Sequence, residues 1–125
     1  MDNTVNNSDA YYQVALELAR QFSEHKGENT LVLDLRENCS FADYFVLTTA
    51  RSARHLASLS QLGWELLKEK GLPVINPDRT DPGGWALLDA GPLIVHIMED
   101  AQRRFYELEK IWFQSKIIYS SSNSS

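Results

Sequence analysis

Residues 83–112 read GGWALLDAGPLIVHIMEDAQRRFYELEKIW, and this stretch decides the fold. Large and small side chains are spaced over residues 85–90 so that a strand there would have two different faces, with the one polar residue, Asp89, on the face of Trp85. The run Asp89-Ala90-Gly91-Pro92 is rich in turn formers, so the chain should reverse there. Residues 93–98 then predict a second strand, antiparallel to the first.

Successive side chains of a strand point to opposite sides, so the first strand should carry Ala86, Leu88 and Ala90 on one face and Trp85, Leu87 and Asp89 on the other. A helix should follow the hairpin, because Glu99 and Asp100 put negative charge where a helix dipole favours it. Its apolar stripe would consist of Ala101, Phe105, Leu108 and Trp112. This unit contains no evident reaction centre and is more typical of a docking surface.

The same stretch follows a long motif: Gly-x-Trp-x-Leu-x-Asp-x-Gly, then Val-His, then Arg-x-Phe-Tyr-x-Leu-Glu-x-x-Trp. Its positions are Gly83, Trp85, Leu87, Asp89, Gly91, Val95, His96, Arg103, Phe105, Tyr106, Leu108, Glu109 and Trp112. A second block, residues 40–49, reads SFADYFVLTT. Both blocks resemble the ribosomal silencing factor family, to which the plant protein Iojap is related. The resemblance spans residues 31–112 and therefore most of the chain.

This resemblance implies a translational repressor that binds the large ribosomal subunit. The implied partner is the universal large-subunit ribosomal protein numbered fourteen, here called uL14. Occupying its face would sterically block joining of the small subunit and slow translation under nutrient limitation. The resemblance implies that Trp85 contacts the partner. We predict that the partner-binding residues are Trp85, Leu87, Asp89, Arg104, Tyr106 and Glu109. Ala50, Arg51 and Pro92 depart from the usual family pattern, which leaves the loop contacts there open.

Composition agrees with a protein partner. The chain has 125 residues, the size of one domain, and 17 acidic against 12 basic residues give a net charge of −5. An acidic protein is poorly suited to binding mainly through nucleic-acid phosphates, so we expect no direct nucleic-acid readout. It suits a basic partner such as a ribosomal protein. A homodimer of the free protein stays open.

Several features bear on compartment and chemistry. Cys39 is the only cysteine, so an intrachain disulfide is excluded, which fits a reducing compartment. No apolar run approaches the roughly 20 residues that span a bilayer, and the first residues lack a signal-peptide pattern, so we expect a cytoplasmic protein. Phosphate-binding glycine motifs and nucleophile motifs are missing from the sequence, so we expect no cofactor and no catalytic residue.

The remaining pattern predicts one domain over residues 8–113, between a disordered segment 1–7 and a flexible serine-rich tail, 114–125. The expected elements are a helix from Ser8 or Asp9 to about His25, a strand at 31–35, a buried strand at 44–48, a helix from Ser52 to Lys70, and a short strand at 74–75. Within the second helix, Gly63 should allow close packing on the sheet. This order predicts an α/β fold with a mixed sheet of about five strands and helices packed on it. The resemblance implies a nucleotidyltransferase-like topology.

Competing interpretations remain for four residues. Asp34 and Asp43 could form the carboxylate pair of a metal-dependent nucleotidyltransferase, the alternative function. Against this, the chain lacks an Asp-x-Asp motif, and we expect Asp34 to face solvent and Asp43 to turn the chain. His96 lies between apolar neighbours and is expected to be a core residue with one hydrogen bond. Trp85 either covers the edge of the core or anchors an interface, and the resemblance favours the interface.

Overall fold

The computed structural model describes residues 6–37, 42–72, 74–75, 80–81, 84–99 and 116–121. Within these ranges the elements are α1 (Asn6–Glu24), β1 (Glu28–Asp34), β2 (Tyr44–Ala50), α2 (Ala53–Glu69), β3 (Thr80–Asp81), β4 (Trp85–Asp89), β5 (Leu93–Glu99) and β6 (Lys116–Ser120). No helix in this part of the chain is long and apolar enough to cross a membrane.

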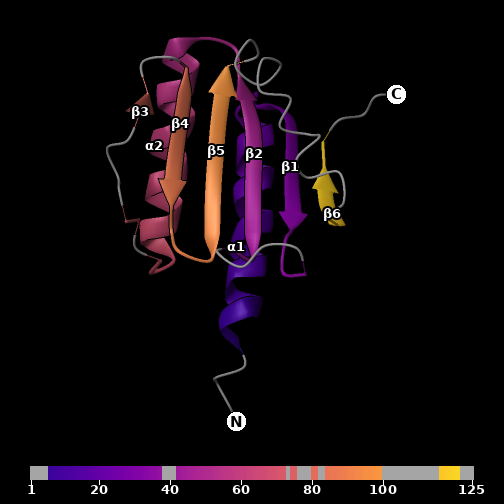
Figure 1. Ribbon diagram of the computed structural model, residues 1–125. Helices are drawn as coiled ribbons and strands as arrows, with labels where there is room; N and C mark the ends of the chain where they lie inside the picture. Colours follow the sequence, from indigo (N-terminus) through magenta and orange to yellow (C-terminus); the bar gives the residue numbers. More distant parts are fainter. Residues whose placement is uncertain are drawn as a thin grey trace.

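The strands form one sheet in the order β3-β4-β5-β2-β1-β6. The central pair, β2 and β5, is parallel, and all other neighbours are antiparallel. Both helices lie on the same side of the sheet, with α1 behind β1 and β2 and α2 behind β4 and β5 (Figure 1). The predicted α/β fold with a mixed sheet is therefore confirmed.

The two helices begin and end for reasons that the sequence contains. Ser52 caps α2 with its side chain, which accepts a hydrogen bond from the His55 backbone N–H at 3.1 Å. α1 ends at Glu24, and the chain turns through Lys26, whose φ is 76°, into Gly27. A Cβ at Gly27 would lie 2.5 Å from the Thr48 hydroxyl oxygen, so only glycine fits this close approach to the sheet. The predicted end of α1 and both ends of α2 are confirmed.

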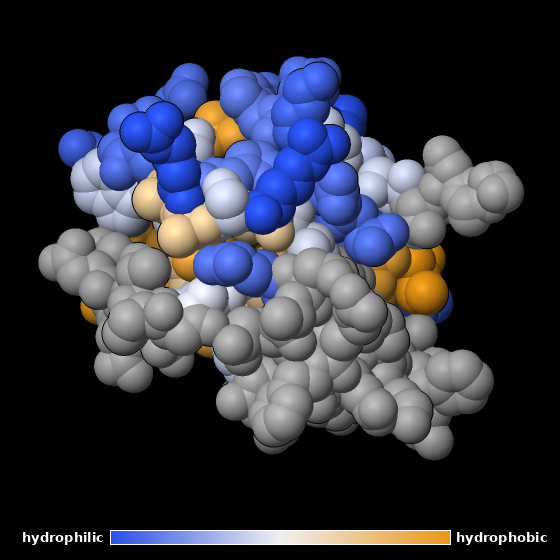
Figure 2. Space-filling model, turned by 90° about the horizontal axis from the view of Figure 1, so that it is seen from above, coloured by the Kyte–Doolittle hydropathy of each residue, from blue (hydrophilic) through white to orange (hydrophobic). Residues whose placement is uncertain are grey.

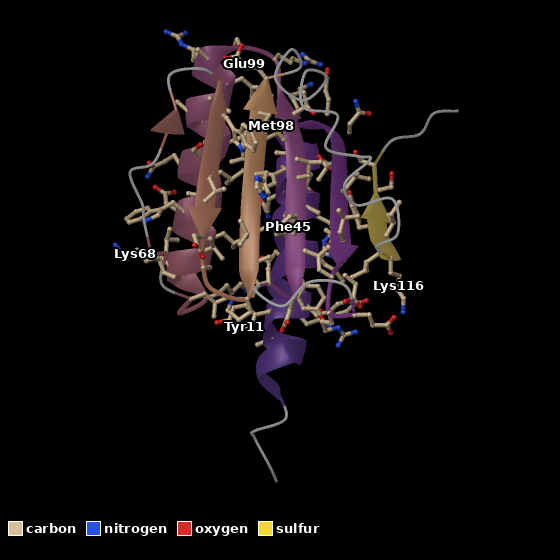
Figure 3. The ribbon with its side chains drawn as sticks, in the orientation of Figure 1. Tyr11, Phe45, Lys68, Met98, Glu99 and Lys116 are labelled. Carbon is tan, nitrogen blue, oxygen red and sulfur yellow. The ribbon has the colours of Figure 1, made fainter. Side chains whose placement is uncertain are left out.

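The sheet has two differently packed faces. The face against the helices, which we call the helix face, packs on the main core and includes Val46, Leu88 and Val95. The opposite face, which we call the second face, is centred on a smaller cluster of buried residues: Leu33, Leu35, Ala42, Phe45, Leu47, Ile94 and Met98. β2 is buried along its whole length, as predicted for a central strand. Figure 3 labels Phe45 on β2 and Met98 on β5, which belong to this cluster and lie at different heights along the sheet.

Three predictions about individual elements were wrong. Val74 and Ile75 do not form a strand; the Ile75 N–H donates one hydrogen bond to the Asp89 carbonyl, and the edge strand is instead β3. The helix α1 already includes residues 6–7, which we expected to be disordered. Residues 116–120, expected in a flexible tail, form the edge strand β6. The predicted helix over residues 100–112 lies outside the described residues.

β6 is an ordered strand because its side chains have partners on the rest of the fold. It pairs antiparallel with β1, and Ile118 and Tyr119 pack against the main core. The Tyr119 hydroxyl lies 3.1 Å from the Ser23 hydroxyl of α1. Just beyond the strand, Ser121 exchanges two hydrogen bonds with the Thr30 backbone, each 2.9 Å long. The serine-rich composition concealed these contacts, since serine supplies hydrogen bonds rather than apolar bulk.

Candidate functional site

The predicted site residues on the hairpin lie on the second face. Strand β4 alternates between buried and half-buried residues, and its buried residues Ala86 and Leu88 pack toward the helices. Trp85 and Leu87 are half-buried on the opposite side, packed at the edge of the second-face cluster. The predicted division of the strand between two faces is confirmed. The second face thus has an aromatic and an aliphatic side chain that are both partly accessible.

Trp85 contacts His96 of the neighbouring strand β5. In the β4–β5 register Trp85 lies opposite Met98, so His96 is its diagonal neighbour on the same face. The indole Nε1–H donates a hydrogen bond to His96 Nδ1 over 3.3 Å. The two ring centroids are 5.9 Å apart with the planes at 51°. The indole is therefore tied to the sheet through its polar atom as well as through its apolar surface.

His96 is a buried core residue with a hydrogen bond, as predicted. Only 7% of its surface is exposed. Phe45 of β2 meets its ring edge-on at a centroid distance of 4.8 Å. Burial lowers the pKa of His96 from 6.5 to about 4, because the charged imidazolium is poorly solvated there. At neutral pH the ring is uncharged and can accept the indole hydrogen bond at Nδ1.

Asp89 ends the same strand and stabilises the hairpin turn. Its Oδ1 accepts a hydrogen bond from the Gly91 N–H at 2.9 Å. Gly91 has a φ of 84°, a backbone conformation that glycine adopts without strain. The chain then continues through Pro92, whose carbonyl accepts hydrogen bonds from the N–H groups of Asp43 and Tyr44 at 2.7 and 3.0 Å. The turn that the sequence predicted is confirmed, and Asp89 has a structural function in it.

Comparison with known proteins identifies the family. The family model described as "Ribosomal silencing factor during starvation" matches residues 8–124. This chain belongs to that family. A ribosomal silencing factor from Chromobacterium violaceum is 31% identical over 87 residues, covering 70% of this chain and 71% of that protein. Membership in this family implies ribosome-associated regulation of translation.

One solved structure and one further sequence are also similar to this chain. A crystal structure of a Chromobacterium violaceum protein matches with a TM-score of 0.73 and 28% identity, covering 82% of this chain and 83% of that chain. A mouse protein named "Mitochondrial assembly of ribosomal large subunit protein 1" is 27% identical over 92 residues, covering 71% of this chain and 40% of its own length. The similarity therefore includes an organellar relative whose name refers to the large subunit.

The silencing-factor site that we predicted is only partly within the described residues. The structure brings Trp85 and Leu87 together on the second face and places Asp89 at the end of the same strand. Arg104, Tyr106 and Glu109 lie outside the described residues, so their part in the site stays a prediction. His96 was considered only as a core residue. Its contact with Trp85 depends on the strand register, which the sequence does not reveal.

Asp34, one of the two carboxylates of the alternative enzyme, is paired with an arginine. We expected Asp34 to face solvent, and this was wrong. The residue is only 9% exposed, because β6 covers that edge of β1. Arg36 occupies both of its oxygens: Oδ1 accepts from Arg36 Nε at 2.9 Å and Oδ2 from Nη2 at 2.8 Å. The Arg36 hydrogen bonds lower the pKa of Asp34. Among the described residues, no group of three or more His, Cys, Asp or Glu side chains is placed to hold a metal ion.

The end of the sheet where β2 and β5 finish has a different character. The described surface there is mainly hydrophilic (Figure 2). His55 of α2 stabilises this end: its Nδ1 accepts the Arg51 backbone N–H at 2.9 Å, and its Nε2 donates to the His25 carbonyl at 2.9 Å. These two hydrogen bonds fix His55 to both neighbouring segments. This polar end is less suited to an apolar docking contact than the second face.

Proposed function

We propose that this protein represses translation by binding uL14 on the large ribosomal subunit and sterically blocking the small subunit from joining. The observation that carries the proposal is the half-buried pair Trp85 and Leu87 on the second face of a ribosomal silencing factor fold. Trp is enriched among the residues that dominate interface energies, and it contributes most when one side is already packed. This activity makes or breaks no covalent bond.

Charge supports the same partner class. The chain has a net charge of −5, whereas proteins that contact ribosomal RNA need positive charge. Attraction between an acidic regulator and a basic ribosomal protein speeds their association and discourages contact with exposed RNA phosphates. The name of the mouse relative, which refers to assembly of the large subunit, agrees with this location.

The size of the surface also fits. A standard protein interface buries about 800 Å² on each partner, which is more than two side chains can supply. We therefore propose that Asp89, Arg104, Tyr106 and Glu109 complete the surface around Trp85 and Leu87. A polar rim around an apolar centre is the usual composition of such an interface.

Sedimentation with purified subunits tests the proposal. The full chain should migrate with the large subunit and leave the small subunit unbound. Added before mixing, it should lower the yield of joined ribosomes in proportion to its occupancy of the large subunit. If it binds the large subunit and joining proceeds at the normal rate, the steric mechanism is wrong. If it binds only the small subunit, the partner is wrong as well.

A further inference from the structure

We propose that His96 is a positioning residue for Trp85: it holds the indole in the orientation that the partner surface requires. This inference rests on the proposed function, because it assigns a role to the residue beneath the proposed anchor. It goes beyond the proposed contact surface, because His96 is buried and would affect binding only through Trp85.

The hydrogen bond fixes the χ2 torsion of Trp85, which apolar packing alone restrains weakly. An indole packed only by its faces can turn about its χ2 torsion at little cost, since that torsion is broad. The bond from Trp85 Nε1 to His96 Nδ1, 3.3 Å long, selects one orientation of the ring. The indole's apolar surface stays on the second face, where Leu87 lies two residues along the same strand.

His96 is itself held rigidly, as a positioning residue must be. In the sheet register it lies between Leu87 of β4 and Leu47 of β2. Phe45 packs edge-on against its ring at 4.8 Å. Figure 3 shows Phe45 at the centre of this face, on the strand next to the one that carries His96. The acceptor therefore belongs to the central part of the sheet and not to a mobile side chain.

The chemistry of histidine matches the requirement. An indole N–H needs an acceptor, and a neutral imidazole provides one on a flat ring that also packs against aromatic neighbours. Acceptance at Nδ1 assigns the imidazole proton to Nε2. Because burial keeps the pKa near 4, the acceptor is present throughout the neutral range. A leucine in this position would fill the space and offer no acceptor.

A binding measurement separates positioning from packing. We would determine Kd for purified large subunits with the wild type, His96→Leu, His96→Asn, Trp85→Phe and the double variant His96→Leu/Trp85→Phe. His96→Leu should weaken binding about three- to tenfold, the cost of ordering one loose side chain on association. His96→Asn, whose amide oxygen lies close to the former Nδ1, should recover most of this loss.

The double variant is decisive, because phenylalanine has no N–H for His96 to hold. His96→Leu should cause no additional loss of affinity in the Trp85→Phe background. An equal loss in both backgrounds would show that His96 acts through general packing, and the proposal would be wrong.

A spectroscopic readout reports on the free protein. The indole N–H signal of Trp85 should show slow hydrogen exchange in the wild type and in His96→Asn, and fast exchange in His96→Leu. Trp64→Phe is the matched control and should leave this signal unchanged. Protection that persists in His96→Leu would contradict the proposed bond.

Two outcomes remain distinguishable from failure of the function itself. If Trp85→Ala leaves large-subunit binding unchanged, the proposed surface is wrong and the inference fails with it. If Trp85→Ala weakens binding but His96→Leu causes the same loss of affinity with Trp85 and with Phe at position 85, only the positioning role fails. Should His96→Leu not fold, His96→Asn and His96→Gln replace it: only the asparagine oxygen reaches the Nδ1 position, so only that variant should preserve affinity.

Discussion

Gly63 of α2 lies against Leu88 of β4 so closely that a Cβ added at Gly63 would come within 2.9 Å of Leu88 Cδ1. This added Cβ would also lie 3.1 Å from Phe22 Cζ of α1. The glycine is thus the point where both helices and the sheet meet. We expect Gly63→Ala to destabilise the protein by about 1–2 kcal/mol, because overpacking outweighs the roughly 1 kcal/mol gain in helix propensity. Urea unfolding followed by circular dichroism measures this.

The exposed position Ser58 provides the control for Gly63. Ser58→Ala on the outer side of α2 should be neutral or slightly stabilising, since alanine favours the helix and meets no neighbour. Equal stabilisation by both substitutions would show that the contact at Gly63 is not tight.

Trp85→Ala should weaken binding to the large subunit by about 2 kcal/mol, or roughly thirtyfold, as expected for an interface anchor. Trp64 of α2 is a suitable control, because it is also half-buried but packs with Lys68, whose Nζ lies 5.0 Å from the ring centroid. Trp64→Ala should leave the affinity unchanged. Co-sedimentation at several protein concentrations gives both values, and similar losses for the two variants would place the surface elsewhere.

Stability should depend on pH through His96. Its pKa is 6.5 in the unfolded chain and about 4 in the folded one, so between these values the unfolded state binds the extra proton. Stability is therefore full above pH 6.5 and falls by up to about 3 kcal/mol as the pH is lowered to 4. The lowered pKa of Asp34 acts only below its ordinary value of 3.8, outside this window.

The pH dependence is measured by urea unfolding at a series of pH values, with His96→Asn as the comparison. The difference in stability between wild type and variant should change across pH 4–6.5 and be constant above it. A constant difference over the whole range would contradict the assignment of the slope to His96.

Thr30 and Thr48 form a buried hydroxyl pair whose oxygens are 2.7 Å apart, and neither residue is exposed. Replacing one partner leaves a buried hydroxyl without its bond, so Thr48→Val should cost about 1–3 kcal/mol. Replacing both should cost less than the sum of the single changes, since no stranded hydroxyl remains. Thermal unfolding of the two single variants and the double variant gives this coupling, and strict additivity would contradict it.

Removing residues 116–125 should destabilise the protein by about 2–4 kcal/mol, because Ile118 and Tyr119 lose their contacts with the core. The uncovered edge of β1 should also promote aggregation, which light scattering detects. Removing only residues 122–125 is the matched control, because every described contact of β6 then remains. If the longer truncation unfolds at the wild-type urea concentration, β6 contributes nothing to stability.

Local signals account for what the sequence predicted correctly. Ser52 defined the start of α2, and the Asp89–Pro92 turn between two apolar segments defined the hairpin. These features depend on neighbours within a few positions, where side-chain chemistry directly determines backbone geometry. The packing role of Gly63 was also predictable, since glycine inside a helix weakens it unless space is short.

Non-local pairing explains what the sequence did not reveal. Whether residues 116–120 join the sheet depends on β1, more than eighty positions away, and their own composition is typical of a loose tail. The Trp85–His96 bond depends on the β4–β5 register, and the burial of Asp34 depends on β6. Each of these relationships needs the assembled sheet, which a pattern along one segment does not describe.

The parallel pairing of β2 with β5 has a consequence for how the chain folds. β4 and β5 can meet as soon as the short turn forms, but β5 reaches β2 only after α2 has carried the chain back across the sheet. The β2–β5 pairing closes a much longer loop than the β4–β5 hairpin, so we expect it to form later and to slow folding. The Trp85–His96 hydrogen bond lies within the β4–β5 hairpin and can form with it, whereas Phe45 of β2 can pack on His96 only after β5 has reached β2.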